Sequence, residues 1–455
     1  MQQRLTRIEA LCLTILLLLI IGMSIIYFQT PPHGPIFICL TILILFSYIK
    51  KFPWKETEKG IIEGIRYGII PIIIFILIGI LISVWVASGT IPTLIAYGFK
   101  IISKDYFLIT VFVLTAIVGT SIGSAFTTAA TLGVAFIGIG GVFGFPLPLI
   151  AGAVISGAFF GDKMSPLSDT TNLASAVAKV DLFEHIRHMM WTTIPAFFIT
   201  LIIYWILGAR FEIEELSNMN GFLMDLQNNT FIHWVTLLPI VILFVLAFIR
   251  FSAIPTLLLG ILSGIILIIL FQPGISVSEL FSIIQDGYKI DTGNEQLNSL
   301  LNRGGIQSMM WSVSLILLSL SMGGLLTKLG VIAKLLEMME SLLVTTGRLI
   351  ATTTVSALSI NVLLGEQYLS IILSGNVFSK KYDQLGVNRK NLSRSLEDGG
   401  TLINPLIPWG VSGVFLTSVL GVATLDYLPY AFFCLICPVI SIVFGFAGIG
   451  LAKEK

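Results

Sequence analysis

The chain has 455 residues, of which 56% are hydrophobic and 11% are charged, whereas about 25% of the residues of an ordinary soluble domain are charged. This composition excludes a water-soluble globular protein. The 26 Lys and Arg residues almost balance the 25 Asp and Glu residues, so no basic surface indicates a nucleic-acid partner.

Apolar runs recur along the whole chain, and many have about 15–20 residues, enough for a helix to cross about 30 Å of hydrocarbon. The first run follows Arg4 and Arg7. It is too long for a signal peptide and lacks a small-residue cleavage site, so we interpret it as the first transmembrane helix. We expect apolar spans at 8–28, 35–49, 69–87, 106–120, 121–143, 147–180, 189–207, 233–249, 253–271, 307–327, 349–361, 365–379, 391–420 and 428–451. The sequence therefore predicts an all-α polytopic protein of the lipid bilayer with about 12–14 transmembrane segments.

Charged residues between these spans predict the orientation in the membrane. Segments 50–66 and 380–394 are rich in Lys and Arg, which is typical of cytoplasmic loops. Segments 208–232 and 272–308 hold more acidic than basic residues and are expected outside. The number of spans between these loops agrees with their assigned sides if both termini are cytoplasmic. We therefore expect a multi-pass protein of the cell membrane.

Marker residues coincide when the chain is shifted along itself by 242 residues. Gly123 meets Gly365, Gly157 meets Gly399, and Pro166 meets Pro408. Because the loop charges place the first copy starting inside and the second starting outside, we expect two inverted-topology repeats. The first would cover 1–207 and the second 233–455, with 208–232 as an external linker. Inverted repeats with broken helices and hairpins are typical of transporters that work by alternating access, whereas the repeated filter motif of a channel is not present.

Segment 161–172 is polar although it lies between two strongly apolar stretches. Pro166 removes a backbone donor and disfavours helix at Ser165, so we expect a break here. A broken helix exposes carbonyl and N–H groups to ions, and Asp162 and Asp169 add negative charge. The alternative is an extramembrane loop between two short helices.

Segment 395–410 interrupts an apolar helix of the second half with the glycine pair 399–400 and two prolines. The shift of 242 residues places Asn404 opposite Asp162, so oxygen ligands would converge from both halves. Glu397 and Asp398 are either part of this site or the solvated start of a cytoplasmic helix. Asn404 is either a ligand or an amide that caps the broken helix.

Glu366 follows Gly365 within an apolar hairpin. A carboxyl group buried there without a partner is a candidate proton carrier or ion ligand.

The remaining reactive residue types favour no further chemistry. We interpret His185 and His188 as interfacial residues among lipid headgroups, with pH sensing as the minor alternative. Cys434 and Cys437 lie in an apolar run and are expected to pack there without a metal or redox role. No Walker phosphate loop, dinucleotide fingerprint or zinc-ligand cluster occurs in the sequence, so we expect no cofactor and no enzymatic activity.

Two long motifs give a specific resemblance. GDKMSPLSDTTNLA at 161–174 and SLEDGGTLINPLIPWG at 395–410 resemble the signature segments of the NhaC-type Na+/H+ antiporter family, and length, hydropathy and motif order extend the similarity over the whole chain. By motif position, the resemblance implies candidate ion-binding residues at both broken helices. These are Asp162, Ser165, Ser168, Asp169, Thr170 and Asn172 at the first, and Glu397, Asp398, Thr401 and Asn404 at the second.

The resemblance implies exchange of cytoplasmic Na+ for external H+. We expect a carboxylate to hold either ion, with Asp162, Asp169 and Asn404 as candidate Na+ ligands, because Na+ prefers hard oxygen ligands. The alternative is a Na+- and H+-coupled exchanger of an organic acid such as malate or lactate, in which Lys163 helps to bind the acid. The apolar helices outside the motifs would form a scaffold and a homodimer surface.

Overall fold

The computed structural model describes residues 5–210, 216–249, 251–339 and 344–453, and for 216–220 it describes the backbone alone. Arg4 and three acidic residues of the expected external linker, Glu212, Glu214 and Glu215, lie outside these ranges. The described chain is helical and has no β-strand, and its β-pairing is limited to an isolated bridge between Val387 and Lys453. The predicted all-α fold is therefore confirmed.

The first half of the chain folds into eleven helices, followed by a helix in the connection to the second half. They are α1 (Arg7–Gly22), α2 (His33–Ile49), α3 (Trp54–Arg66), α4 (Ile69–Ala87), α5 (Thr90–Ile101), α6 (Phe107–Ile122), α7 (Ala125–Thr128), α8 (Val134–Val142), α9 (Leu147–Met164), α10 (Asp169–Ala178), α11 (Leu182–Gly208) and α12 (Leu216–Asn229).

The second half contains the other twelve helices. They are α13 (Leu238–Phe248), α14 (Ala253–Phe271), α15 (Val277–Asp286), α16 (Glu295–Leu301), α17 (Ile306–Lys328), α18 (Val331–Met339), α19 (Thr346–Leu364), α20 (Gln367–Gln384), α21 (Arg389–Gly400), α22 (Val411–Leu420), α23 (Thr424–Tyr427) and α24 (Phe432–Ala447).

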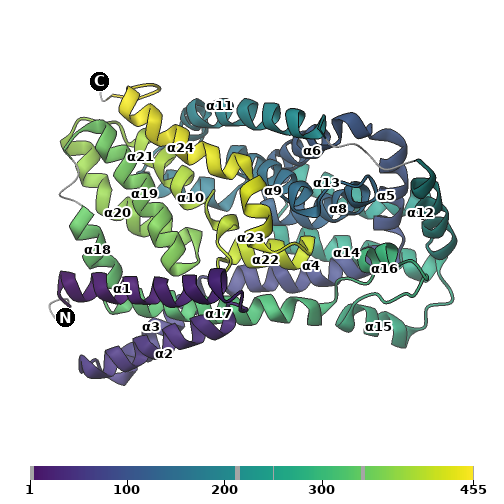
Figure 1. Cartoon of the computed structure of the whole chain (residues 1–455), viewed down its shortest axis with the longest axis horizontal. Coiled ribbons are helices and arrows are strands. Elements are labelled where there is room, and N and C mark those ends of the chain that lie inside the picture. Colours follow the sequence, from purple (N-terminus) through teal and green to yellow (C-terminus); the bar gives the residue numbers. More distant parts are fainter. Residues whose placement is uncertain (1–4, 211–215, 250, 340–343, 454–455) are drawn as a thin grey trace.

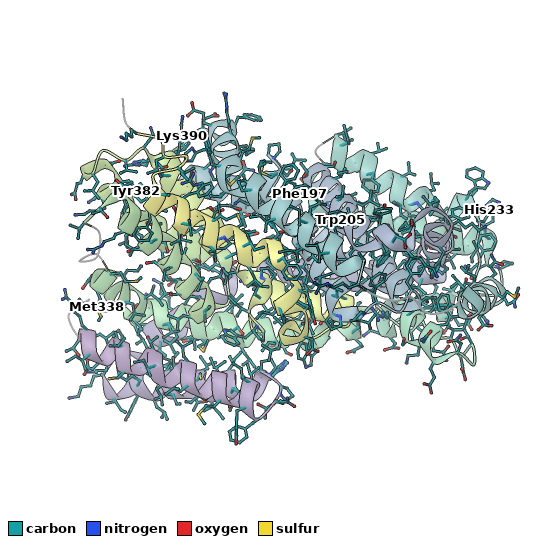
Figure 2. All side chains as sticks on the ribbon, turned by 45° about the horizontal axis from the view of Figure 1, so that its top comes forward. Phe197, Trp205, His233, Met338, Tyr382 and Lys390 are labelled. Carbon is teal, nitrogen blue, oxygen red and sulfur yellow. The ribbon has the colours of Figure 1, made fainter. Side chains whose placement is uncertain are left out.

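Many of these helices can cross a membrane. In the described ranges, nine helices are long and apolar enough, or up to twelve if each bent pair of helices forms one span. The upper value meets the lower end of the expected 12–14 segments. Large apolar side chains cover the outer surface, as Trp205 on α11 illustrates in Figure 2, and such a surface suits contact with lipid.

The connections between helices are segregated by charge. Both termini lie toward one end of the molecule, and α12, α15 and α16 lie at the other end (Figure 1). An ion pair between Glu9 and Lys50 holds the basic end of α2 beside the start of α1. The amide of Asn388 donates to the carbonyl of Ala452 (3.2 Å), so the basic connection before α21 lies beside the C-terminal residues. The predicted cytoplasmic loops therefore share the end that holds the termini.

Several helix boundaries recur in the two halves. A shift of 242 residues superimposes five of them, namely Ile122 on Leu364, Ala125 on Gln367, Leu147 on Arg389, Asp169 on Val411, and Ala178 on Leu420. Gly123 and Gly365, which end the matched helices α6 and α19, both adopt positive φ, +71° and +69°. This left-handed conformation suits glycine, which has no Cβ. The marker residues of the sequence thus coincide with matching turns.

Close packing of α9 on α6 positions the end of α9. A Cβ atom at Gly161 would lie 2.5 Å from the backbone nitrogen of Thr120 and 2.6 Å from the carbonyl oxygen of Ala116. Only glycine allows this approach between the two backbones. This contact fixes the last turn of α9, which contains Gly161 and Asp162, against the C-terminal end of α6.

Candidate functional site

The helix break in the first motif follows from its sequence. α9 ends at Met164, and Ser165, which precedes Pro166, has extended dihedral angles (φ −87°, ψ 132°), as expected for a residue before proline. The hydroxyl of Ser168 then caps α10 by accepting the amide of Thr171 (3.4 Å). Asp162 lies before the break and Asp169 begins the next helix, so the break predicted from the sequence is present.

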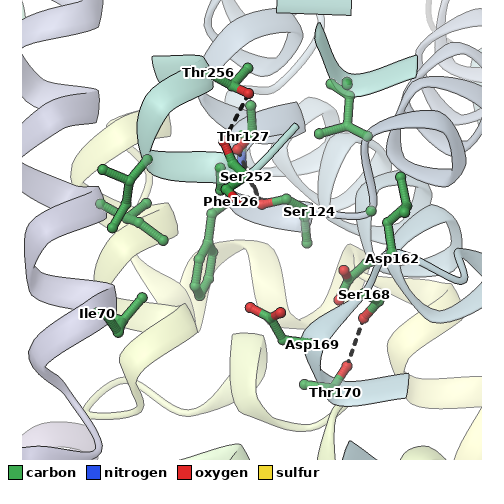
Figure 3. Close-up of a pocket in the computed structure, with 18 of the residues that line it drawn as sticks. Ile70, Ser124, Phe126, Thr127, Asp162, Ser168, Asp169, Thr170, Ser252 and Thr256 are labelled. Carbon is green, nitrogen blue, oxygen red and sulfur yellow. Dashed lines mark hydrogen bonds between the residues drawn. The ribbon is translucent and has the colours of Figure 1, made fainter. Parts of the chain in front are cut away.

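The break opens into a cavity of about 640 Å³. Asp162, Ser168, Asp169 and Thr170 line one side of this cavity (Figure 3). The other sides come from elements that sequence reasoning did not connect with the motif. They are the start of α4, the hairpin between α6 and α7, the connection between α13 and α14 with the start of α14, and the tip of the hairpin between α19 and α20. Their polar lining residues are Ser124, Thr127, Ser252, Thr256, Gln367 and Tyr368. The cavity thus joins elements from both halves of the chain.

The basic residue of the motif is separated from this cavity. Lys163 forms an ion pair with Asp398 of α21, and both side chains are 0% exposed. The hydroxyl of Thr192 on α11 donates to the other carboxylate oxygen of Asp398 (3.1 Å), and Lys163 Nζ lies 3.3 Å from Cys437 Sγ. Consecutive residues therefore have different environments, since Asp162 lines the cavity and Lys163 is sealed between helices.

Glu397 connects this buried layer to the cavity. The hydroxyl of Thr170, which lines the cavity, donates to Glu397 Oε1 (3.0 Å), and Ser168 Oγ lies 3.1 Å from Thr170 Oγ1. Glu397 and Asp398 are both fully buried. The alternative that they form the solvated start of a cytoplasmic helix is therefore wrong. Thr401, which directly follows the end of α21, is buried as well.

Asn404 makes hydrogen bonds that hold the second broken helix. Its Nδ2 donates to Asn361 Oδ1 (2.7 Å) and to the carbonyl of Gly365 (3.2 Å), while its Oδ1 accepts the amide of Ser412 (2.7 Å). The residues that line the cavity include Asp162 and Asp169 but not Asn404. The arrangement favours the capping interpretation, and the carboxylates of the first half do not meet this amide in the cavity.

Three other candidate residues have local structural contacts. The hydroxyl of Ser165 accepts the amide of Leu167 (3.2 Å), and Asn172 donates to the carbonyl of Ser168 (2.7 Å). Glu366 is the N-cap of α20, where its Oε2 accepts the amide of Leu369 (2.8 Å). These contacts stabilise the helix ends around the cavity.

One sequence interpretation needs correction. His185 and His188 do not lie among lipid headgroups, because both rings are buried between α11 and α21. His185 Nδ1 lies 2.8 Å from Ser393 Oγ, and His188 Nε2 lies 3.1 Å from Asn391 Oδ1. Cys437 is buried as expected, and it also contacts the Lys163–Asp398 pair. The sequence carries no signal for these contacts, because they depend on how α11, α21 and α24 pack together.

A chain with many apolar spans, two broken helices and buried carboxylates at the breaks has the architecture of a secondary active transporter. A family model described as the Na+/H+ antiporter family matches residues 157–449, and the chain belongs to this family.

Similar proteins extend this relationship over the whole chain. The Na+/H+ antiporter NhaC of Alkalihalophilus pseudofirmus is 46% identical over 96% of this chain and 94% of its own length. NhaC of Bacillus subtilis is 45% identical over 98% of this chain and 99% of its own length. The malate-2H+/Na+-lactate antiporter of B. subtilis is 35% identical over 93% and 91% of the two chains. The resemblance to the NhaC-type family is thus confirmed, and these relatives are antiporters.

Proposed function

We propose that this protein exchanges cytoplasmic Na+ for external H+ by alternating access, and that both ions use the cavity at the first broken helix. The observation that carries the proposal is the convergence of Asp162 and Asp169 on one cavity beside the hydroxyls of Ser168 and Thr170. Carboxylate and hydroxyl oxygens are hard ligands that suit Na+. The two NhaC relatives are named as Na+/H+ antiporters, which supports the same ion pair for this chain.

Exchange follows if the two ions compete for the same carboxylates. Among the described residues, no group of three or more His, Cys, Asp or Glu side chains could hold a metal ion, so Na+ would complete its shell with hydroxyls, carbonyls or water. A proton on Asp169 or Asp162 removes the negative charge that Na+ needs. Glu397, which accepts from Thr170, would adjust this competition from the buried layer. One ion must therefore leave before the other binds.

Loop charge and chain order assign the cavity to one side of the membrane. The positive-inside rule assigns the end with both termini and the basic connections to the cytoplasm, and the chain order then places the connection between α13 and α14 on the same side. Phe251, Ser252 and Ala253 of that connection line the cavity together with Ile70 at the start of α4. We infer that the cavity faces the cytoplasm in this state, and that 1–207 and 233–455 are the two inverted repeats.

An organic-acid exchanger is the alternative, and one relative is named as an antiporter of malate and lactate. That role needs a positive group in the cavity, and Lys163 is occupied by Asp398 away from it. The charge of the cavity therefore favours cation exchange.

Replacing Asp169 with Asn tests the proposal. In proteoliposomes that contain a pH-sensitive dye, we expect a Na+ pulse to move protons with the wild-type protein and not with D169N, since the amide neither ionises nor carries a proton. D426N, at an exposed position on α23, is the matched control and should exchange normally. Normal exchange by D169N would overturn the assignment of this carboxylate.

A further inference from the structure

The cavity is much larger than the proposed ions require. Its volume of about 640 Å³ lies within the range of about 300–1,000 Å³ that is typical of pockets for small molecules. A water molecule occupies about 30 Å³ in the liquid, so a Na+ ion with a full hydration shell would fill only part of this space. The site can therefore accommodate an organic solute.

The charges at the cavity select the sign of that solute. Among the described residues that line it, the charged side chains are Asp162 and Asp169. Arg250, which precedes Phe251 in the chain, lies outside the described residues. Lys163 is fully buried against Asp398, whereas Glu397 accepts a hydrogen bond from Thr170 of the cavity lining. The cavity consequently attracts cations and repels carboxylates.

Besides the two carboxylates and the hydroxyl and amide residues named above, the lining is apolar and aromatic. Phe126, Phe159 and Tyr368 contribute rings, and Ile70 and Ile74 contribute aliphatic surface.

The ring of Phe126 is held in place by two others, since its centroid lies 5.7 Å from that of Phe75 and 4.8 Å from that of Phe415. Aromatic faces beside carboxylates recognise alkylated ammonium groups, because the rings attract positive charge and tolerate methyl groups that cannot donate hydrogen bonds.

We propose that this cavity also binds a small quaternary ammonium ion, of about the size of choline, and exchanges it for protons in competition with Na+. The ammonium group would lie between Asp169 and the ring of Phe126, which both line the cavity and are labelled in Figure 3. The inference rests on the proposed function, because the same carboxylates would release the organic cation when they take up protons.

Choline is a suitable probe because it is permanently charged, cannot carry a proton and does not cross the bilayer as a free base. The full-length protein is reconstituted in proteoliposomes with an internal pH-sensitive dye. We expect a choline pulse to move protons, and choline present with Na+ to raise the Na+ concentration needed for half-maximal proton movement. Uptake of radiolabelled choline, driven by a proton gradient, should be blocked by excess Na+. Malate and lactate should have no effect.

A ring substitution provides the matched comparison. F126L removes the aromatic face, so the choline concentration for half-maximal proton movement should rise about tenfold relative to that for Na+. F198L, at a side chain that is 55% exposed on α11, should leave this ratio unchanged. An unchanged ratio in a folded F126L protein would overturn the role of the ring.

The outcomes with wild-type protein separate the two proposals. If Na+ moves protons and excess choline neither competes nor moves them, the inference is wrong and the proposed function stands. If choline moves protons and Na+ does not, the proposed function is wrong and the organic cation remains. If malate or lactate competes instead, the assigned charge selectivity is wrong.

Discussion

At the scale of single residues, the site depends on how neighbouring charges are separated. Asp162 lines the cavity and is 8% exposed, while Lys163 is fully buried in an ion pair with Asp398. A buried pair gains little over an apolar pair of similar volume, but the loss of one partner leaves an uncompensated charge. The pair therefore fixes α9 against α21 and keeps a positive charge away from the proposed cation site.

Substitutions of this pair should be strongly non-additive. We expect K163M or D398N alone to lower the free energy of unfolding by about 3–5 kcal/mol, and the double variant K163M/D398N to cost much less than the two single changes together. Thermal unfolding in detergent, followed by tryptophan fluorescence, measures the difference. The exposed pair Lys334–Glu337 (2.8 Å) is the control, and its loss should cost about 0–1 kcal/mol. Additive effects at Lys163 and Asp398 would contradict the buried pair.

Glu366 provides a second test at this scale, because its position suits a helix cap as well as a proton carrier. It is 1% exposed and caps α20, and the cavity is lined by the next two residues and not by Glu366 itself. We expect E366Q to retain exchange, since an amide oxygen can also accept the amide of Leu369. E366A should lower stability by about 0.5–2 kcal/mol. Loss of exchange in a stable E366Q protein would instead support a proton carrier.

The sequence identifies some of these residues and misses others for a physical reason. Asp162 and Asp169 are conspicuous because charge within an apolar helix is costly unless it is functional or paired. The partner of Lys163 is not evident, since Asp398 is 235 residues away and only helix packing brings the two together. Thr192 and Cys437 lie in otherwise ordinary helices and become part of the buried layer through the same packing.

At the scale of helices, the close contact of α9 with α6 positions Asp162. A Cβ atom at Gly161 would lie 2.5 and 2.6 Å from two backbone atoms of α6, closer than non-bonded atoms approach. We expect G161A to push the end of α9 away from α6, to displace Asp162 and to reduce Na+-dependent proton movement by about tenfold or more. The measurement is dye-detected flux in proteoliposomes, normalised to the amount of reconstituted protein.

The control for this substitution is G22A at the end of α1, where a Cβ atom would meet nothing within 4 Å. This variant should match the wild type in both flux and stability. Equal flux from G161A and G22A would show that the contact between α9 and α6 does not position the carboxylate.

The sequence predicts where transmembrane helices occur better than it predicts how the helices pack. Long apolar runs such as α4 and α14 are evident from hydropathy alone. By contrast, α3 and α15 were not among the expected spans, because they are amphipathic and carry charge, and their helical form depends on packing against α17 and α4. The breaks at Pro166 and between α21 and α22 follow from local proline and glycine chemistry. The cavity at the first break depends instead on the packing of further elements, among them α4, α14 and the hairpin between α6 and α7.

At the scale of the whole molecule, the two halves share helix boundaries, but residues at equivalent positions differ in solvent exposure. Asp169 and Val411 begin the equivalent helices α10 and α22. Asp169 lines the open cavity, while Val411 is 3% exposed. If the two halves are inverted repeats that exchange conformations, the second-half positions should open to the outside when the first-half cavity closes.

Labelling of Val411 tests this exchange of roles. With V411C in cells, we expect a membrane-impermeant thiol reagent added outside to react faster than with V419C, which lies on the same helix and is 1% exposed. Native Cys39, Cys434 and Cys437 are buried, and the wild-type chain gives the background. Sodium present only on the cytoplasmic side binds the inward-open state and shifts the population toward that state. We therefore expect cytoplasmic sodium to slow the labelling of V411C and to leave the labelling of V419C unchanged. Equal rates for both variants, or labelling of V411C from the cytoplasmic side alone, would contradict the exchange of roles between the repeats.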